Sequence, residues 1–396
     1  MASSFKSLAS GDATSTRTLL HESIPVTGSI VSGTYGGDGV ALGSEPHIKT
    51  YSHGMFQSVY DYPHLSSSAN HIFDITAGFA DSSALSSSTT SQISKKINIY
   101  NQMAQVLMGY DETGSVRLFD EDGDIIAGGT KLKECYFINF SRILSKDEIK
   151  KGTFELELGC NSDFSQTDAI FSKRIKITDS SGSDGYFVNS PAGEYGVLFA
   201  QTTRDGDATL STPLLNVETI TSNASVATTR PACGLIFYQA GVAVISGSAF
   251  NDAALGGILH TTNNDAMEMI DNVGSTYNGF QIITGSTVNV MANALRNRIY
   301  NIQFNNTTEL NSTIYFCRVN NSEFNYSANP TYLSTSSGGP SEIVVKDGSV
   351  GSDPHSYITT VGLYSADNEL LAVAKVSEPL KKDPSNELTL RVRLDY

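Results

Sequence analysis

The spacing of apolar residues constrains the fold of this chain more than any other feature. Apolar residues occur in short runs or alternate with polar ones, and turns rich in Gly, Ser, Asn and Asp separate the runs. Residues 154–158, Phe-Glu-Leu-Glu-Leu, alternate strictly, which is the period of a strand with one buried face. No repeat of fixed period is present, which disfavours a solenoid or propeller. The pattern predicts a mainly β fold.

The same reasoning predicts strands along most of the chain. They cover residues 136–140, 174–177, 234–238, 241–245, 300–304, 313–317, 342–345, 357–361, 370–374 and 388–394. Of these, 357–361 is expected to be the interior strand of its sheet. The polar stretch 211–229 is expected to be a loop. A hairpin is expected to join 116–119 to 125–126 through an acidic turn.

Two stretches have a helical period instead. Around residues 94–109, apolar residues recur every three or four positions after a serine that can cap the helix, and Gly109 ends the pattern. Residues 288–299 repeat the period more weakly. Ser145 and Glu148 have the spacing of a capping box, which predicts one short helical turn. The expected fold class is therefore mainly β with a few short helices.

The length of 396 residues suggests two or three domains. Residues 1–65 are rich in Gly, Ser and Thr without helical period, so they are expected to form an extended N-terminal arm. We expect a mixed β domain over 66–180 with its helix near 94–109, a β-rich middle or insertion domain over 181–290, and a β-sandwich-like C-terminal domain over 291–396.

Charge limits the classes of partner. The chain has 26 Lys and Arg against 41 Asp and Glu, a net charge of −15, which excludes a protein held by nucleic-acid phosphates and disfavours an anionic membrane surface. Only 17% of residues are charged, so much of the surface is neutral and polar. Such surfaces are buried against a neighbour at lower desolvation cost than charged ones. We therefore expect large protein interfaces.

The sequence also predicts the compartment. The first residues lack the apolar segment of a secretory signal, and no run approaches the ~20 apolar residues that cross a membrane. The four cysteines, Cys135, Cys160, Cys233 and Cys317, lie far apart and form no CxxC pair. We expect buried, reduced thiols and a protein made and assembled in a cytoplasm.

Motifs for catalysis or metal binding are missing from the sequence. It contains neither the nucleophile elbow Gly-x-Ser-x-Gly nor a phosphate-binding GK[ST] triplet. The acidic run 120–124 departs from a calcium loop because Ile125 stands where glycine is required, so we interpret it as a hairpin turn. Four histidines lie near two aspartates without the spacing of a metal site: His47, His53, His64, His71, Asp61 and Asp74. We expect no catalytic residue, cofactor or metal, although a carboxylate pair for glycoside hydrolysis needs no sequence signature.

Three long blocks resemble a known class of protein. The first comprises 69–79, 95–111 and 138–159; the second is 296–333, with RNRIYNIQFNNTTELNSTIYFCRVNNSEFNYSANPTYL; the third is 357–396, beginning YITTVGLYSADNELLAVAKV. Together they resemble a virion structural protein of contractile-tailed phages, particularly the T-even-like cyanophages of marine cyanobacteria. The resemblance covers about half of the chain and leaves 180–290 unmatched.

The resemblance implies a non-catalytic structural subunit of the virion that is assembled in the host cytoplasm. A position in the tail baseplate is ranked first, and the neck or collar is the alternative. The implied partners are other phage virion proteins and further copies of the chain in a symmetric ring, without nucleic acid or membrane. We name Phe324, Tyr326, Tyr332 and Tyr357 as interface candidates, because alternating aromatic residues in a polar segment can anchor in a neighbour's pocket.

Three interpretations compete with this one. The aromatic residues of 320–330 can instead fold back onto their own domain. A fibre-attaching or glycan-binding module would show an exposed groove lined by Tyr in 180–290. A virion-borne polysaccharide depolymerase would place two carboxylates in one cleft.

Overall fold

The structure is a computed structural model. It describes residues 5–26, 46–87, 90–123, 129–159, 174–179, 186–203, 231–251, 258, 268–270, 276–278, 287–296, 298–327, 333–334, 342–343 and 354–396. The chain divides into two compact units. One comprises Leu20–Thr308 and is called the central unit; the other combines Met1–Leu19 with Glu309–Tyr396 and is called the terminal unit.

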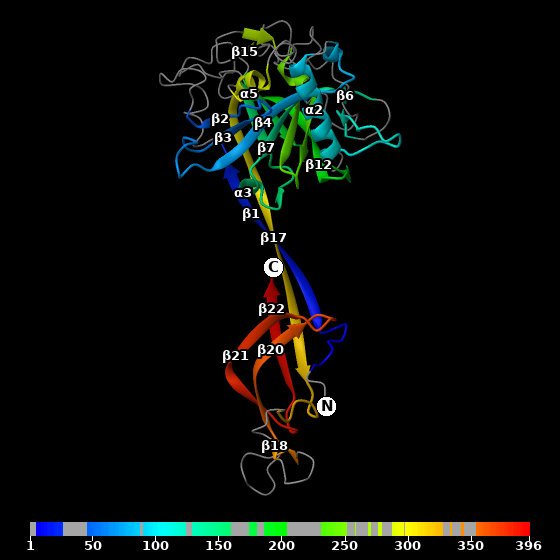
Figure 1. Cartoon of the computed structure of the whole chain (residues 1–396), viewed down its shortest axis with the longest axis vertical. Coiled ribbons are helices and arrows are strands. Elements are labelled where there is room, and N and C mark those ends of the chain that lie inside the picture. The colour runs from blue at the N-terminus through cyan, green and yellow to red at the C-terminus, as the bar shows by residue number, and fades with distance from the viewer. Residues whose placement is uncertain are drawn as a thin grey trace. The chain divides into compact units, whose positions relative to one another are not determined.

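The central unit is built on one large antiparallel sheet (Figure 1). Its strands neighbour one another in the order β9-β10-β12-β13-β14-β7-β4-β3-β2, with β17 next to β9 and β11 next to β12. Their bounds are β2 (Ile48–Thr50), β3 (Gln57–Tyr60), β4 (His71–Phe79), β7 (Glu134–Phe140), β8 (Glu148–Ile149), β9 (Glu155–Gly159), β10 (Arg174–Asp179), β11 (Tyr186–Ser190), β12 (Gly193–Thr203), β13 (Ala232–Phe237), β14 (Val242–Ser246) and β17 (Ile299–Val319). The prediction of a mainly β chain is confirmed.

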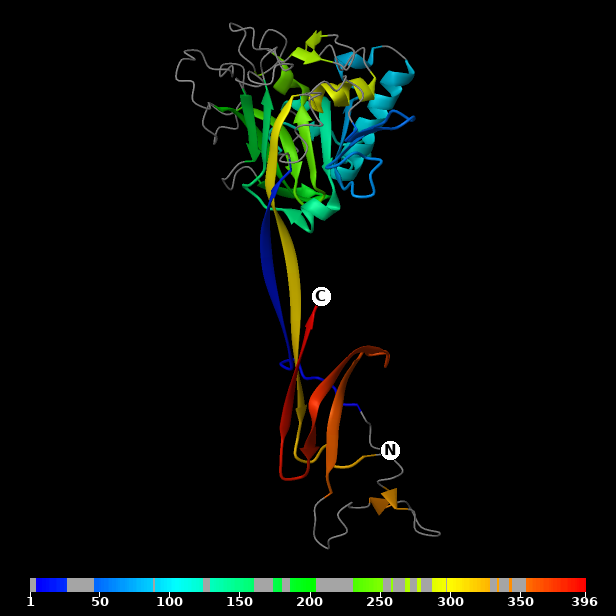
Figure 2. The same ribbon diagram turned by 90° about the vertical axis from the view of Figure 1, so that its left-hand side faces the viewer.

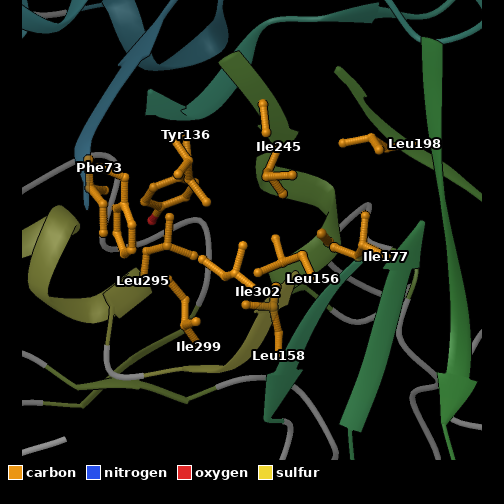
Figure 3. Close-up of a cluster of buried hydrophobic side chains, with 14 of the residues drawn as sticks. Phe73, Tyr136, Leu156, Leu158, Ile177, Leu198, Ile245, Leu295, Ile299 and Ile302 are labelled. Atoms are coloured by element: carbon orange, nitrogen blue, oxygen red, sulfur yellow. The ribbon is translucent and has the colours of Figure 1, made fainter. Parts of the chain in front are cut away.

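Both faces of this sheet are buried. In β7, Tyr136 and Ile138 belong to one apolar cluster, whereas Cys135 and Phe137 belong to a second cluster on the opposite face. Figure 3 shows the first cluster, where side chains from several strands and from helix α5 (Val288–Arg296) meet. Continuous apolar runs such as 234–238 are therefore strands that are covered on two sides.

Helix α2 (Ser91–Leu107) lies against β4 (Figure 1). The Thr90 hydroxyl accepts a hydrogen bond from the Ile93 amide and caps the first turn, and Gly109 follows the helix at a φ of 77°. Periodicity therefore predicted both α2 and α5, although α5 ends at Arg296 and Ile299 begins β17. Close packing of α2 depends on Gly78 in β4, because a Cβ at that position would lie 2.4 Å from the Lys96 carbonyl oxygen.

The remaining elements of the central unit are short. They are the helical turns η1 (Ala84–Ser86), α3 (Arg142–Ser145) and η4 (Gly247–Phe250), and the strand pairs β5 (Phe119–Asp120) with β6 (Lys131–Leu132) and β15 (Glu268–Ile270) with β16 (Thr276–Asn278). The expected hairpin begins at β5, but residues 125–126 lie outside the described part, as do 211–229.

The terminal unit is built from paired antiparallel strands (Figure 2). β20 (Ser356–Tyr364) pairs with β21 (Leu370–Lys382), and the 312–319 part of β17 pairs with β22 (Leu388–Asp395). Short strands β18 (Leu333–Ser334) and β19 (Glu342–Ile343) form a third pair. Strand β1 (Ala13–Pro25) neighbours β17, and both continue from one unit into the other. A β-sandwich over 291–396 stays a prediction.

Three local predictions were wrong. Ser145 ends helix α3 instead of beginning a helix, because Lys146 adopts a φ of 51° and Glu148 pairs with β17 as part of β8. Strand 357–361 is not interior, since no residue of β20 is buried. Residues 300–304 and 313–317 belong to one continuous strand, β17, because β9, β8 and β22 pair with successive parts of it.

The structure also divides the chain differently from the expected domains. Within 1–65, β2 and β3 join the central sheet, and β1 is a long strand with exposed side chains. Strands from 66–180 and 181–290 alternate in one sheet, where β14 pairs with β7 and β12 with β10. The division observed falls between Thr308 and Glu309, inside β17. Sequence composition does not mark it, because the strand is continuous there.

Candidate interaction surface

The terminal unit buries few apolar side chains. Among its described residues, Val319 and Val392 are the apolar residues that are buried. The apolar residues of β20 and β21 are half-buried or exposed, although their strands alternate as if one face were to be covered. A domain gains most of its stability from apolar burial, so this unit has apolar surface left for a partner.

Three of the four predicted interface residues lie exposed in this unit. The exposed fraction is 39% for Phe324, 41% for Tyr326 and 59% for Tyr357. Tyr332 lies outside the described residues. Phe324 adopts a φ of 53°, which is uncommon for a residue with a large side chain and indicates a tightly specified turn.

A buried lysine fixes the turn that carries Phe324 and Tyr326. The Lys382 ammonium, which is 0% exposed, donates to the Asn325 side-chain oxygen at 2.6 Å, the Asp383 carbonyl at 2.8 Å and the Asn321 carbonyl at 3.1 Å. The Asn325 amide in turn donates to the Asn321 carbonyl at 2.8 Å. A buried charge is costly without partners, and these bonds satisfy it.

The same lysine lies next to the strand that carries Tyr357. Lys382 pairs with Ser356 across the β20–β21 sheet, and the Ser356 hydroxyl donates to the carbonyl of Phe324. Tyr357 follows Ser356 in β20, and its ring meets the buried His355 ring edge-on at 5.7 Å. Two segments far apart in sequence are thus tied together. We call Phe324, Tyr326 and Tyr357 the aromatic patch.

An ion pair holds the start of the same turn. The Lys6 ammonium lies 2.5 Å from the Glu323 carboxylate, which also accepts the Asn320 amide at 2.9 Å. The hydrogen bond from Lys6, followed by that from the Asn320 amide, lowers the pKa of Glu323. Glu323 is therefore ionised at neutral pH, and the turn keeps this bond there.

The acidic hairpin of the central unit was the main alternative site. Glu121 and Asp122 line a cavity of about 120 Å³ together with Thr130, Val197 and Phe199. Two carboxylates in one cleft are what a polysaccharide depolymerase would require. Ligand pockets measure roughly 300–1,000 Å³, however, so this cavity is too small to seat a sugar chain. That no reaction is catalysed stays a prediction.

Burial shifts the pKa values of Asp120 and Glu121. Burial raises the pKa of Glu121 to about 7, against a hydrogen bond with Thr130 that lowers it. Burial also raises the pKa of Asp120, although Lys131 forms an ion pair with it across the β5–β6 pair. The described residues 121–123 follow β5, which pairs with β6, whereas residues 124–126 of the expected hairpin lie outside the described part.

The histidine-rich stretch is dispersed into separate contacts. His71 Nε2 lies 2.8 Å from the Asp74 carboxylate, and His64 Nδ1 lies 2.8 Å from a backbone carbonyl oxygen. The His53 ring stacks on Tyr51 at 5.1 Å. In the described ranges, no group of three or more His, Cys, Asp or Glu residues is placed to hold a metal. That no metal binds stays a prediction.

The described cysteines and the tyrosines near the middle of the chain occupy no metal or sugar site. Cys135 and Cys233 are free and buried, and burial raises the pKa of both thiols. Cys317 is free and half-buried, and Cys160 lies outside the described residues. Within the described part of 180–290, Tyr195 and Tyr238 are fully buried, so they line no exposed glycan groove.

Comparisons with protein-family models, curated proteins and solved structures found no match to this chain. In the described part of the chain, no helix is both long and apolar enough to span a membrane. Sequence reasoning found the aromatic patch but missed Lys382, because a lysine doublet in a polar-apolar alternation normally indicates a solvated face. The sequence predicted residues 370–374 as a strand but not that Leu370 and Leu371 are exposed.

Proposed function

We propose that this chain is a non-catalytic structural subunit of a contractile-tailed phage virion, situated in the tail baseplate and bound there to other virion proteins. The observation that carries the proposal is the aromatic patch. Phe324, Tyr326 and Tyr357 are exposed, while the backbone that presents them is held by the buried Lys382. An ordered aromatic surface loses little conformational entropy on binding, which is the property of interface hot spots.

The resemblance supports the choice of a virion. Its second and third blocks, 296–333 and 357–396, contain β17, β20, β21 and β22, so they include the aromatic patch and most of the described terminal unit. A low content of charged residues agrees with a subunit whose surface is covered by neighbours. The neck or collar is the alternative position, and the experiment below separates the two.

The test locates the chain in particles of the phage that encodes it. Antibody-gold labelling of purified virions is expected to mark the distal end of the tail, with the chain present by mass spectrometry. Label beside the head would replace the baseplate with the neck. Purified particles that lack the chain would overturn the proposal.

A pair of variants tests whether the aromatic patch carries the binding. An aromatic hot spot contributes about 2 kcal/mol or more, which corresponds to roughly a 30-fold change in affinity. Phage carrying Phe324→Ala with Tyr326→Ala should therefore incorporate much less of the chain. Tyr62→Ala, at an exposed tyrosine of the central unit, is the matched control and should incorporate normally.

A further inference from the structure

The β20–β21 hairpin is incomplete as a sheet. Within the described part of the terminal unit, each of the two strands pairs with the other and with no third strand. Each keeps an unpaired edge of backbone N–H and C=O groups, which is a template for another strand. A two-stranded sheet is also only marginally stable in water by itself.

Large apolar side chains gather at the turn end of this hairpin. The exposed fraction is 44% for Tyr364, 52% for Leu370, 68% for Leu371 and 52% for Val373. Tyr364 lies opposite Leu370 in the register, and its ring covers Gly362, where a Cβ would lie only 2.9 Å from it. We call these four residues the hairpin patch.

The opposite face of the hairpin is covered only in part. Ile358, Val361 and Leu363 alternate with exposed residues and are half-buried. Removing apolar side chains from water is favourable, so the hairpin has apolar stabilisation still to gain from association.

The distribution of charge favours a second copy over a partner of opposite charge. The terminal unit has 9 Lys and Arg against 12 Asp and Glu, a net charge of −3, whereas the central unit has 17 against 29, a net charge of −12. Two identical chains repel each other least where their own charge is nearly balanced. The hairpin itself has both signs, with Lys375 and Lys381 on the same strand as Glu378.

We propose that the hairpin patch is a self-association surface, and that its occupant is the β20–β21 hairpin of a second copy of this chain. Apolar residues of one copy meet those of the other, and an unpaired strand edge is free to extend the sheet across the contact. The inference rests on the proposed function in one respect: a structural subunit is present in many copies, so another copy is available as the partner. It is distinct from the aromatic patch, which serves other proteins.

The test uses the purified full chain and sedimentation velocity across a wide range of concentration. The wild type is expected to sediment at a multiple of 42.4 kDa. Leu371→Glu with Val373→Glu should shift it to the monomer mass, because two buried carboxylates would be unpaired. Val188→Glu, an apolar strand residue of the central unit that is 75% exposed, is the control and should keep the wild-type mass.

A second measurement covers the case in which the double variant fails to fold. A photo-crosslinking amino acid at position 371 should yield covalent dimers of the chain, whereas the same amino acid at position 188 should not. A wild type that is monomeric throughout, or no dimer crosslinked through position 371, would overturn the inference. Neither result depends on finding the chain in a virion, so failure here is distinguishable from failure of the proposed function.

Discussion

At the scale of single residues, Lys382 links local chemistry to the candidate surface. Its ammonium is completely buried, and its acceptors are two backbone carbonyls and the side chain of Asn325. A lysine used in this way organises a turn from inside, while the aromatic side chains around that turn remain outside. Neither an arginine nor an uncharged residue would satisfy these oxygens with the same geometry.

Lys382→Met should therefore loosen the turn. Leaving buried acceptors without a donor costs about 1–3 kcal/mol. Hydrogen exchange of peptides covering 320–326 should accelerate in this variant. Lys381→Met is the matched control, because Lys381 is more than half exposed and its contact with Asp383 spans 3.7 Å. Equal exchange in both variants would show that Lys382 does not hold the turn.

The raised pKa of Glu121 makes the stability of the central unit depend on pH. Its folded pKa of about 7 lies above 4.5, the usual value for a glutamate side chain, so the folded state binds more protons between these values. Stability is then lost as pH rises from about 4.5 to about 7. Each pKa unit corresponds to about 1.4 kcal/mol, so Glu121→Gln should stabilise the central unit by on the order of 3 kcal/mol at pH 8 and by little at pH 4.

The measurement is urea unfolding of both proteins at several pH values. Asp111→Asn is the control of opposite sign, because hydrogen bonds from Thr113 and the Ser115 amide lower the pKa of Asp111. That variant should lose stability at neutral pH. If the free energies of unfolding of Glu121→Gln and wild type differed by the same amount at every pH, Glu121 would not have a raised pKa in the folded state.

At the scale of elements, the close contact between α2 and β4 requires that residue 78 has no side chain. Gly78→Ala would place a Cβ 2.4 Å from the Lys96 carbonyl oxygen and 2.9 Å from the Tyr100 nitrogen. Both atoms belong to the helix backbone, which cannot move without repacking. Overpacking of this kind costs about 1–3 kcal/mol.

A lower urea midpoint for Gly78→Ala is the expected result. Gly11→Ala has nothing within 4 Å of its added Cβ and should leave the midpoint unchanged. An unchanged urea midpoint for Gly78→Ala would contradict the prediction, because it would show that α2 can shift away from β4 at no cost.

The elements also show which features a sequence can predict. Both long helices and the buried strands β7, β13 and β14 were predicted, because their periodicity reflects burial within one chain. Strands β4 and β12 are also largely buried but were not predicted. Strand 357–361 was assigned to an interior because its composition is that of a buried strand, yet β20 has no buried residue. Apolar composition predicts that a residue is buried, but it does not predict whether its own chain or a partner buries it. Phe324 and Tyr326 were recognisable as interface candidates because their neighbours are polar.

At the scale of the whole molecule, the two units differ in the source of their stability. The central unit has two apolar clusters of its own, whereas buried apolar residues are scarce in the described part of the terminal unit. We therefore expect two thermal transitions. Only the transition of the terminal unit should move to higher temperature as protein concentration increases, since association stabilises by mass action.

The two transition temperatures can be measured by calorimetry at two protein concentrations. Hydrogen exchange then assigns each transition to a unit. Amides of β7 and β14 should stay protected through the first transition. A single transition that is independent of concentration would contradict separate sources of stability. Leu371→Glu should abolish the concentration dependence, and Val188→Glu should preserve it.

The terminal unit is assembled from residues 1–19 and 309–396, and this has a consequence for synthesis. On the ribosome, residues 20–308 emerge as a continuous segment and can fold before the rest is made. The first 19 residues can pack with residues 309–396 only after these last 88 residues are made, which takes about 4–18 s at 5–20 residues per second. The hairpin patch is thus completed only after the central unit is in place. Translation order delays self-association until each copy has a folded body.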